Sequence, residues 1–340
     1  MSDTAHHSSR RRFLASGAVW AGVGLSVAGI GGCSYRMLRP IQALAAAPAA
    51  PAPVSKQFPN GIRLHMIQTG WVAVKREHRA FSGPTALRLP AIMASRTWTE
   101  WMPVTAFIIE HPEGLIAVDT GESAKIAEPD YTACDGVTGL FYRRNLQFAI
   151  GPNDEIGPQM QALNLAPDRV GKVVMTHLHS DHMGGMAAFP KAEFYVSDAA
   201  RNGHAGALMC RIPKGTRFSN VRYEERAQGA QNPQNRQNGQ GVFSNTMALT
   251  QDGAVSIIPT PGHASGHQSV LLETGEKRVC LVGDAAFSLN QIENGEIGGI
   301  VENHGDAARS AALLKQEYQQ FGTVMLPTHD PDNAARLMSA

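Results

Sequence analysis

Short apolar runs separated by polar turns recur along the chain from residue 54 onward. Residues 62–69 alternate between apolar and polar positions, which is typical of a half-buried strand. Residues 106–109 and 115–118 are two apolar runs joined by the turn sequence His-Pro-Glu-Gly, so we predict a β-hairpin there. Short, mostly apolar runs predict further strands at residues 170–175, 192–196, 255–258, 279–282 and 324–326.

Two longer segments place apolar residues at helical spacing. Residues 155–165 form a short amphipathic pattern, and residues 307–321 place Ala311, Leu314 and Tyr318 on one face. In each half of the chain, strands are followed by a helix. This order predicts the α/β class, with two mixed sheets packed face to face and helices outside, an αββα sandwich, in one domain over residues 54–340.

The first 53 residues are predicted to lie outside this domain. Arg10, Arg11 and Arg12 precede a moderately apolar run that ends at Ile30, and this resembles a twin-arginine export signal followed by an Ala/Pro linker. We therefore expect an exported, periplasmic protein. Two forms stay open: a soluble protein after signal cleavage, and a membrane-anchored one held by the uncleaved segment or by a lipid on Cys33.

A polar insertion is predicted at residues 227–245. Its central stretch, residues 228–241, has almost no apolar content and cannot contribute to a core. It is either a disordered insertion or part of a mobile lid over the functional site.

Charge and cysteine content restrict the function classes. The 30 Lys and Arg residues nearly balance the 29 Asp and Glu residues, so no nucleic-acid partner is expected. Beyond Cys33, the chain contains Cys134, Cys210 and Cys280. An odd number without short spacing predicts no disulfide framework. Cys280 lies in a predicted core strand and is expected to be a small buried residue.

The strongest chemical signal follows the predicted strand at residues 170–175. His177, His179, Asp181 and His182 lie within six positions, and their nitrogen and carboxylate ligands suit zinc or another first-row divalent metal. Side chains two apart on an extended segment project the same way, so His177 and His179 can share one ion. Asp181 and His182 are expected to face a second ion.

Three further ligand candidates each follow a short apolar run. They are His263, Asp284 and His329, after the predicted strands at residues 255–258, 279–282 and 324–326. Ligands at successive strand ends can converge on one edge of a sheet. A metal site built from both halves of the chain is therefore predicted.

These motifs, in this order, resemble the metallo-β-lactamase superfamily across nearly all of the chain beyond the export signal. The resemblance implies that His177, His179 and His263 hold one metal ion. It implies that Asp181, His182 and His329 hold the other and that Asp284 bridges the two. It also implies two divalent ions, with Zn²⁺ expected, and a support role for Asp119 rather than a ligand role.

The same resemblance implies metal-dependent hydrolysis. Two ions would bridge a hydroxide that attacks the substrate, with Asp284 holding both ions. Asp181 would orient that hydroxide and pass a proton to the leaving group. No Gly-x-Ser-x-Gly elbow is present that would supply a serine nucleophile. We therefore assign catalytic roles to Asp181 and Asp284 and expect a small-molecule ester or lactone as substrate.

Within the superfamily, residues 260–269 and the pair His329-Asp330 look like the N-acyl homoserine lactone lactonases. The long gap between His182 and His263 and the export signal look more like methyl parathion hydrolase-like enzymes. Several lactonases have a tyrosine three places after the bridging aspartate. Here that position is Phe287, which we predict lines the substrate pocket.

The preferred hypothesis is an enzyme that opens lactones or cleaves carboxylic esters. An organophosphate or aryl ester hydrolase is the alternative, and a single-iron persulfide dioxygenase is a third hypothesis. The oligomeric state stays open. His111 is expected to be solvated in its turn, and His267 to be a structural residue or a support behind the ligands. The other histidines are expected to lie on the surface or in the core: His65, His78, His204 and His304.

Overall fold

A computed structural model of the protein describes residues 44–128, 130–225 and 242–340. The export signal predicted within the first 53 residues lies almost wholly outside the described residues, and so does most of the predicted insertion at residues 227–245. Within the described part of the chain, no helix is long and apolar enough to cross a membrane.

The first sheet has eight strands and is mixed. Its central feature is the predicted hairpin, in which Phe107 pairs with Val118 in antiparallel register. Beyond this hairpin, the strands run parallel to one another as far as the edge. The order is β1 (Val54–Gln57), β2 (Arg63–Val74), β3 (Met102–His111), β4 (Gly114–Val118), β6 (Val170–Val174), β7 (Glu193–Val196) and β8 (Arg217–Asn220), with β5 (Leu146–Ala149) paired to β2.

The second sheet has six strands, all from the later part of the chain. β13 and β14 run parallel, and the other neighbours are antiparallel. The order is β14 (Val324–Pro327), β13 (Arg278–Gly283), β12 (Gln268–Glu273), β11 (Val255–Pro259), β10 (Asn245–Ala248) and β9 (Glu224–Glu225).

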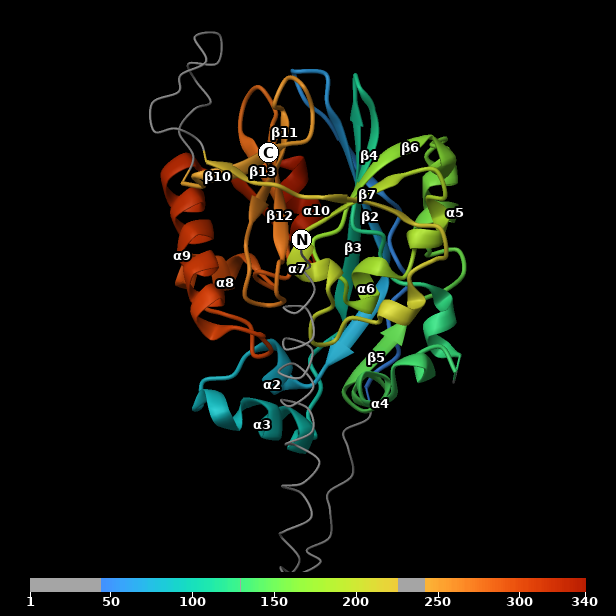
Figure 1. Cartoon of the computed structure of the whole chain (residues 1–340), viewed down its shortest axis with the longest axis vertical. Coiled ribbons are helices and arrows are strands. Elements are labelled where there is room, and N and C mark those ends of the chain that lie inside the picture. The colour runs from blue at the N-terminus through green and yellow to red at the C-terminus, as the bar shows by residue number, and fades with distance from the viewer. Residues whose placement is uncertain (1–43, 129, 226–241) are drawn as a thin grey trace, which may run out of the picture. The chain divides into compact units, whose positions relative to one another are not determined.

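The two sheets pack face to face around one apolar cluster. Leu64 and Phe107 of the first sheet contribute to this cluster together with Ile257, Val270 and Leu281 of the second. Alternate residues of the same strands point outward, and helices cover them on both sides (Figure 1). The αββα prediction is confirmed.

Helices cover both outer faces. α5 (Ile156–Ala162) packs on the first sheet, and α8 (Leu289–Asn294) and α9 (His304–Phe321) pack on the second. α9 begins at the Asn303 cap, whose side chain accepts a hydrogen bond from the Asp306 backbone, and ends at left-handed Gly322. The other helices are α2 (Arg76–Arg79), α3 (Arg88–Ala94), α4 (Gly136–Asn145), α6 (Ser180–Met183), α7 (Asp198–Arg201) and α10 (Asn333–Met338).

Cys134 and Cys210 form a disulfide, so the prediction of no disulfide framework was wrong. The two residues lie 76 positions apart, in the 3₁₀ helices η3 (Ala133–Asp135) and η6 (Met209–Arg211), which pack together only in the folded chain. Cys280 is buried and unpaired, as predicted.

His111 was expected to be solvated in its turn, and that was also wrong. It is buried, and its Nε2 donates to Asp252 Oδ2 at 3.0 Å. The partner lies in a turn of the second sheet's half of the chain, so local sequence around the hairpin could not reveal it.

Candidate metal centre

The structure brings all seven predicted ligands together at one edge of the sandwich. In each of two groups, the possible ligand atoms lie within 4.8 Å of one another. His177, which follows β6 in the first sheet, joins residues that follow strands of the second sheet. The first group is His177, His179, His263 and Asp284, and the second is Asp181, His182 and His329.

Asp284 lies between the two groups. Its Oδ2 is 3.5 Å from His263 Nε2 of the first group, and its Oδ1 is 3.2 Å from His182 Nε2 and 3.3 Å from His329 Nε2 of the second. One carboxylate oxygen therefore faces each group, which is the geometry that a bridging ligand requires.

The first group is tightly gathered around His179. Its Nδ1 lies 2.8 Å from His177 Nε2 and 3.0 Å from His263 Nε2. Hydrogen bonds on the opposite ring nitrogens hold two of these rings, because His179 Nε2 donates to Ala205 O at 3.0 Å and His263 Nδ1 donates to Ile300 O at 3.2 Å. These bonds leave the inward nitrogens free to act as ligands.

Asp119 supports the second group from behind. Its Oδ2 accepts from His182 Nδ1 at 2.7 Å and from the Thr176 hydroxyl at 2.8 Å, and its Oδ1 accepts from the Thr176 backbone N–H at 2.7 Å. His329 Nδ1 donates to Pro103 O at 2.8 Å. Asp119 thus stands behind the ligands and not among them, as the sequence resemblance implied.

Gly184 and Gly185 let the ligand loop, which carries His177 to His182, approach the turn after β4. A Cβ on Gly184 would lie 2.7 Å from Glu122 Cα, and one on Gly185 would lie 2.2 Å from Thr120 O. Thr120 also bonds the loop directly, since its N–H and hydroxyl both donate to His182 O at 2.7 Å. The backbone that carries Asp181 and His182 is thereby fixed against the first sheet.

The electrostatics of the site favour bound cations. Burial holds the pKa of His177 and His263 well below the usual range and lowers that of His179 to about 4, so these rings are neutral ligands. Burial opposes ionisation of Asp284, but His329 and His182 outweigh it and hold its pKa well below normal. The buried His182 Nε2 and Asp284 Oδ1 make no hydrogen bond. Asp284 in turn raises the pKa of His182 and His329 against the effect of burial. The neutral imidazoles of the first group, the ionised carboxylate and the unpartnered inward atoms fit divalent metal ions.

The wall of the site is partly aromatic. Phe287 is buried, and its ring centroid lies 5.8 Å from that of His263 and 5.5 Å from that of His329. It therefore stands beside both groups, where a pocket residue was predicted.

Sequence reasoning missed His78, which lies on α2 near the same site. Its ring is buried, its Nδ1 has no hydrogen-bond partner, and burial together with the nearby His179 lowers its pKa to about 3. The His78 carbonyl accepts from Ile300 N, and Ile300 O in turn accepts from His263. No metal-binding spacing links His78 to the ligands, so only the folded chain reveals it.

The other histidines near the ligands have structural roles. His267 Nε2 accepts from the Asp284 backbone N–H at 3.0 Å, and its Nδ1 lies 2.9 Å from the Thr260 hydroxyl oxygen. His204 Nε2 accepts from Leu178 N at 3.0 Å. His267 thus helps to place Asp284, and His204 helps to place the ligand loop.

The chain is similar in sequence to known proteins. The N-acyl homoserine lactonase AttM of Rhizobium radiobacter is 27% identical over 240 residues, which cover 70% of this chain and 86% of that protein. A probable metallo-hydrolase of Mycobacterium tuberculosis, Rv2300c, is 31% identical over 189 residues, or 53% of this chain and 56% of that one.

Solved structures show the same fold. An AiiA variant of B. thuringiensis with N-decanoyl-L-homoserine at its active site aligns with a TM-score of 0.59 at 19% identity, covering 85% of this chain and 97% of that one. AidC, described as a dizinc quorum-quenching lactonase, aligns with a TM-score of 0.55 at 14% identity, covering 82% and 91%. The sequence model of the Metallo-beta-lactamase superfamily matches residues 99–323. That match spans well over half of the chain, and the chain therefore belongs to the metallo-β-lactamase superfamily.

Proposed function

We propose that the protein is a dinuclear metal-dependent hydrolase that opens N-acyl homoserine lactones or cleaves closely related carboxylic esters. The observation that carries the proposal is the gathering of seven ligands into two groups with Asp284 between them. The curated relatives named as N-acyl homoserine lactonases support the lactone over the phosphotriester alternative. The chain has a full set of ligands for two ions, and this does not favour a dioxygenase that binds a single iron.

Zn²⁺ is the metal we propose for both positions. The set consists of five histidines and two aspartates, and imidazole nitrogen combined with carboxylate oxygen is a typical zinc environment. When bound, two such ions supply Lewis acidity and an activated water at neutral pH.

The protein's own residues accept the proton of the attacking water and deliver it to the leaving group. Asp284 lies between the two groups, and Asp181, in the second group, has its Oδ2 3.5 Å from His329 Nε2. In lactone opening, a water oxygen bonds to the carbonyl carbon and the ring C–O bond breaks. The water's proton passes to the Asp181 carboxylate and from there to the departing alkoxide oxygen, which gives a hydroxy acid.

Phe287 supplies apolar surface to this pocket. A phenyl ring beside both ligand groups favours an acyl chain over a charged substituent at that position. An N-acyl lactone combines such a chain with a reactive ester, which is why it fits better than a small polar ester.

We also propose export to an oxidising compartment. The arginine-containing segment at residues 10–12 resembles an export signal, and the Cys134–Cys210 disulfide is of a kind that persists outside the reducing cytosol.

Elemental analysis combined with a pH-indicator assay tests the function. The chain from residue 54 onward should contain two zinc ions and release acid promptly from an N-acyl homoserine lactone. Two ions with turnover of phosphotriesters but no lactone would refute the substrate assignment. One iron per chain with oxygen uptake would refute the hydrolase.

A further inference from the structure

A short segment at residues 204–206, which we call the support segment, lies directly behind His179. The His179 Nε2 donates to Ala205 O at 3.0 Å, and the His204 ring centroid lies 5.0 Å from that of His179. The His204 Nε2 also accepts from the backbone N–H of Leu178 at 3.0 Å. The segment therefore contacts both the ring of a predicted ligand and the backbone that precedes it.

The bond to Ala205 decides which nitrogen of His179 can bind metal. A neutral imidazole carries one proton, and the Ala205 carbonyl holds it on Nε2. The lone pair then lies on Nδ1, the nitrogen that faces His177 and His263. If the carbonyl moved away, the proton could shift to Nδ1 and block the ligand atom.

The support segment lies so close to the His179 ring that no side chain fits at position 206. Gly206 has φ +87°, and a Cβ there would lie 2.6 Å from His179 Nε2. A single hydroxyl then joins the segment to the ligand loop, because Tyr142 donates to Gly206 O at 3.0 Å and accepts from Ser180 N at 3.2 Å. Tyr142 is buried on α4, so this bridge is shielded from water.

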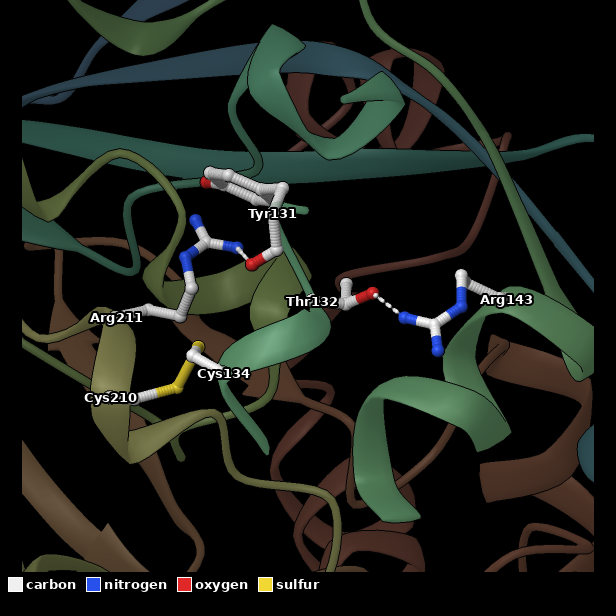
Figure 2. The surroundings of a disulfide bond; sticks show 6 residues. All are labelled: Tyr131, Thr132, Cys134, Arg143, Cys210 and Arg211. Carbon is white, nitrogen blue, oxygen red and sulfur yellow. Dashed lines mark hydrogen bonds between the residues drawn. A yellow bond between two sulfur atoms is a disulfide. The ribbon is translucent and has the colours of Figure 1, made fainter. Parts of the chain in front are cut away.

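The disulfide ties together the same two pieces of chain. Cys134 lies in η3, just before α4 with its Tyr142, and Cys210 lies in η6, just after the support segment. Figure 2 shows neighbouring ties in this region, where Arg211 stacks on the Tyr131 ring and donates to the Tyr131 carbonyl at 3.3 Å. The two pieces of chain are therefore joined twice, by the disulfide between Cys134 and Cys210 and by the hydrogen bond from Tyr142 to Gly206.

We propose that the Cys134–Cys210 disulfide positions His179 for metal binding, acting through Tyr142 and the support segment. The first ligand group then holds its ion at full affinity only in the oxidised chain, whereas the second group, in which Asp119 and Pro103 support His182 and His329, depends less on the disulfide. This inference rests on the proposed function only in that both groups must bind metal. Tyr142 and Gly206 are positioning residues, since both act through the backbone and ring of the ligand loop.

The test measures metal affinity without substrate. The full chain, as wild type, Tyr142→Phe and the double variant Cys134→Ser/Cys210→Ser, is loaded with Zn²⁺ and titrated with a chelator. Loss of an outer support of a metal-bound histidine weakens binding roughly 10- to 100-fold. We expect that loss for one of the two ions in both variants and a smaller loss for the other, because Tyr142 also accepts from Ser180 N beside Asp181.

Two controls separate positioning from general damage. Tyr318→Phe removes a hydroxyl that donates to Glu293 at 2.8 Å on the exposed side of α9, and it should leave both affinities unchanged. A phosphine reductant should weaken one ion in the wild type and have no effect on the double cysteine variant. Cobalt substitution gives a second readout, because the absorption bands of one ion should change more than those of the other.

Unchanged affinities in folded Tyr142→Phe and double cysteine variants would overturn the proposal. Equal weakening of both ions, with a lower melting temperature of the metal-free chain, would also overturn it, because the disulfide would then stabilise only the fold. If the wild type binds no metal at all, the proposed function itself fails, and this result is distinct from the other two. If the cysteine variant does not fold, the phosphine-reduced wild type still tests the role of the disulfide, and Tyr142→Phe still tests the hydroxyl bridge.

Discussion

Replacement of Asp119 by asparagine should weaken the second metal group without unfolding the chain. Asp119 is a non-glycine residue with φ +57°, and asparagine is among the few residues that adopt this backbone readily. The substitution therefore removes charge while it preserves the turn. It takes away an ionised acceptor from His182 Nδ1 at 2.7 Å and places an amide N–H there or at the Thr176 hydroxyl.

Two independent arguments set the size of the effect. Hydrogen bonds to charged groups contribute about 1.5–3 kcal/mol. Loss of the outer partner of a metal-bound histidine costs roughly 10- to 100-fold in affinity, which at ~1.36 kcal/mol per factor of ten is about 1.4–2.7 kcal/mol. The agreement predicts one ion weakened by one to two orders of magnitude, measured by chelator competition.

A surface aspartate provides the matched control. Asp168→Asn removes an exposed carboxylate paired with Lys191 and should leave both metal affinities unchanged. Circular dichroism should show the same fold for both variants. If Asp119→Asn bound both ions as tightly as the wild type, the assignment of His182 as a ligand supported by Asp119 would be wrong.

Three further predictions address the bridge, the pocket and a buried acid. Asp284→Ala should lose one metal ion and most activity while the fold survives, so two ions and full rate by elemental analysis and kinetics would refute the bridging role. Phe287→Leu should keep two ions but raise KM for long-chain acyl lactones more than for short ones, and a uniform loss of kcat would contradict a pocket role. Burial raises the pKa of Glu122 from 4.5 to about 8, so the folded chain keeps a proton that the unfolded chain releases. The free energy of unfolding should therefore fall as pH rises from 4.5 towards 8, and Glu122→Gln should flatten this slope in denaturant titrations at several pH values.

The metal groups could be predicted because their chemistry is concentrated in local sequence. His177 to His182 supply four of the ligands within one loop, and each later ligand follows an apolar run that proved to be a strand. Two apolar runs joined by a turn sequence likewise predicted the hairpin at β3 and β4. Local patterns of this kind depend on neighbours a few residues away, which a single sequence displays directly.

The surroundings of the site could not be predicted in the same way. The disulfide joins residues 76 positions apart, and the odd number of cysteines gave no indication of the pairing. The carbonyl of Ala205 is a backbone group that any residue could supply, so no side-chain pattern marks it. His78 approaches the ligands only because Ile300 connects its backbone to His263. These contacts arise from the packing of distant segments, so no spacing in the sequence predicts them.

The division of ligands between the two sheets links metal content to the assembly of the domain. His177 to His182 follow a strand of the first sheet, whereas His263, Asp284 and His329 follow strands of the second. Neither half alone offers a complete set, so each ion would bind tightly only after the sheets have docked. A ligand that binds only the native state adds about 2.7 kcal/mol of stability at one hundred times its dissociation constant. Bound metal would thus stabilise the contact between the two sheets. Removal of the metal by a chelator would weaken that contact before it disturbed either sheet.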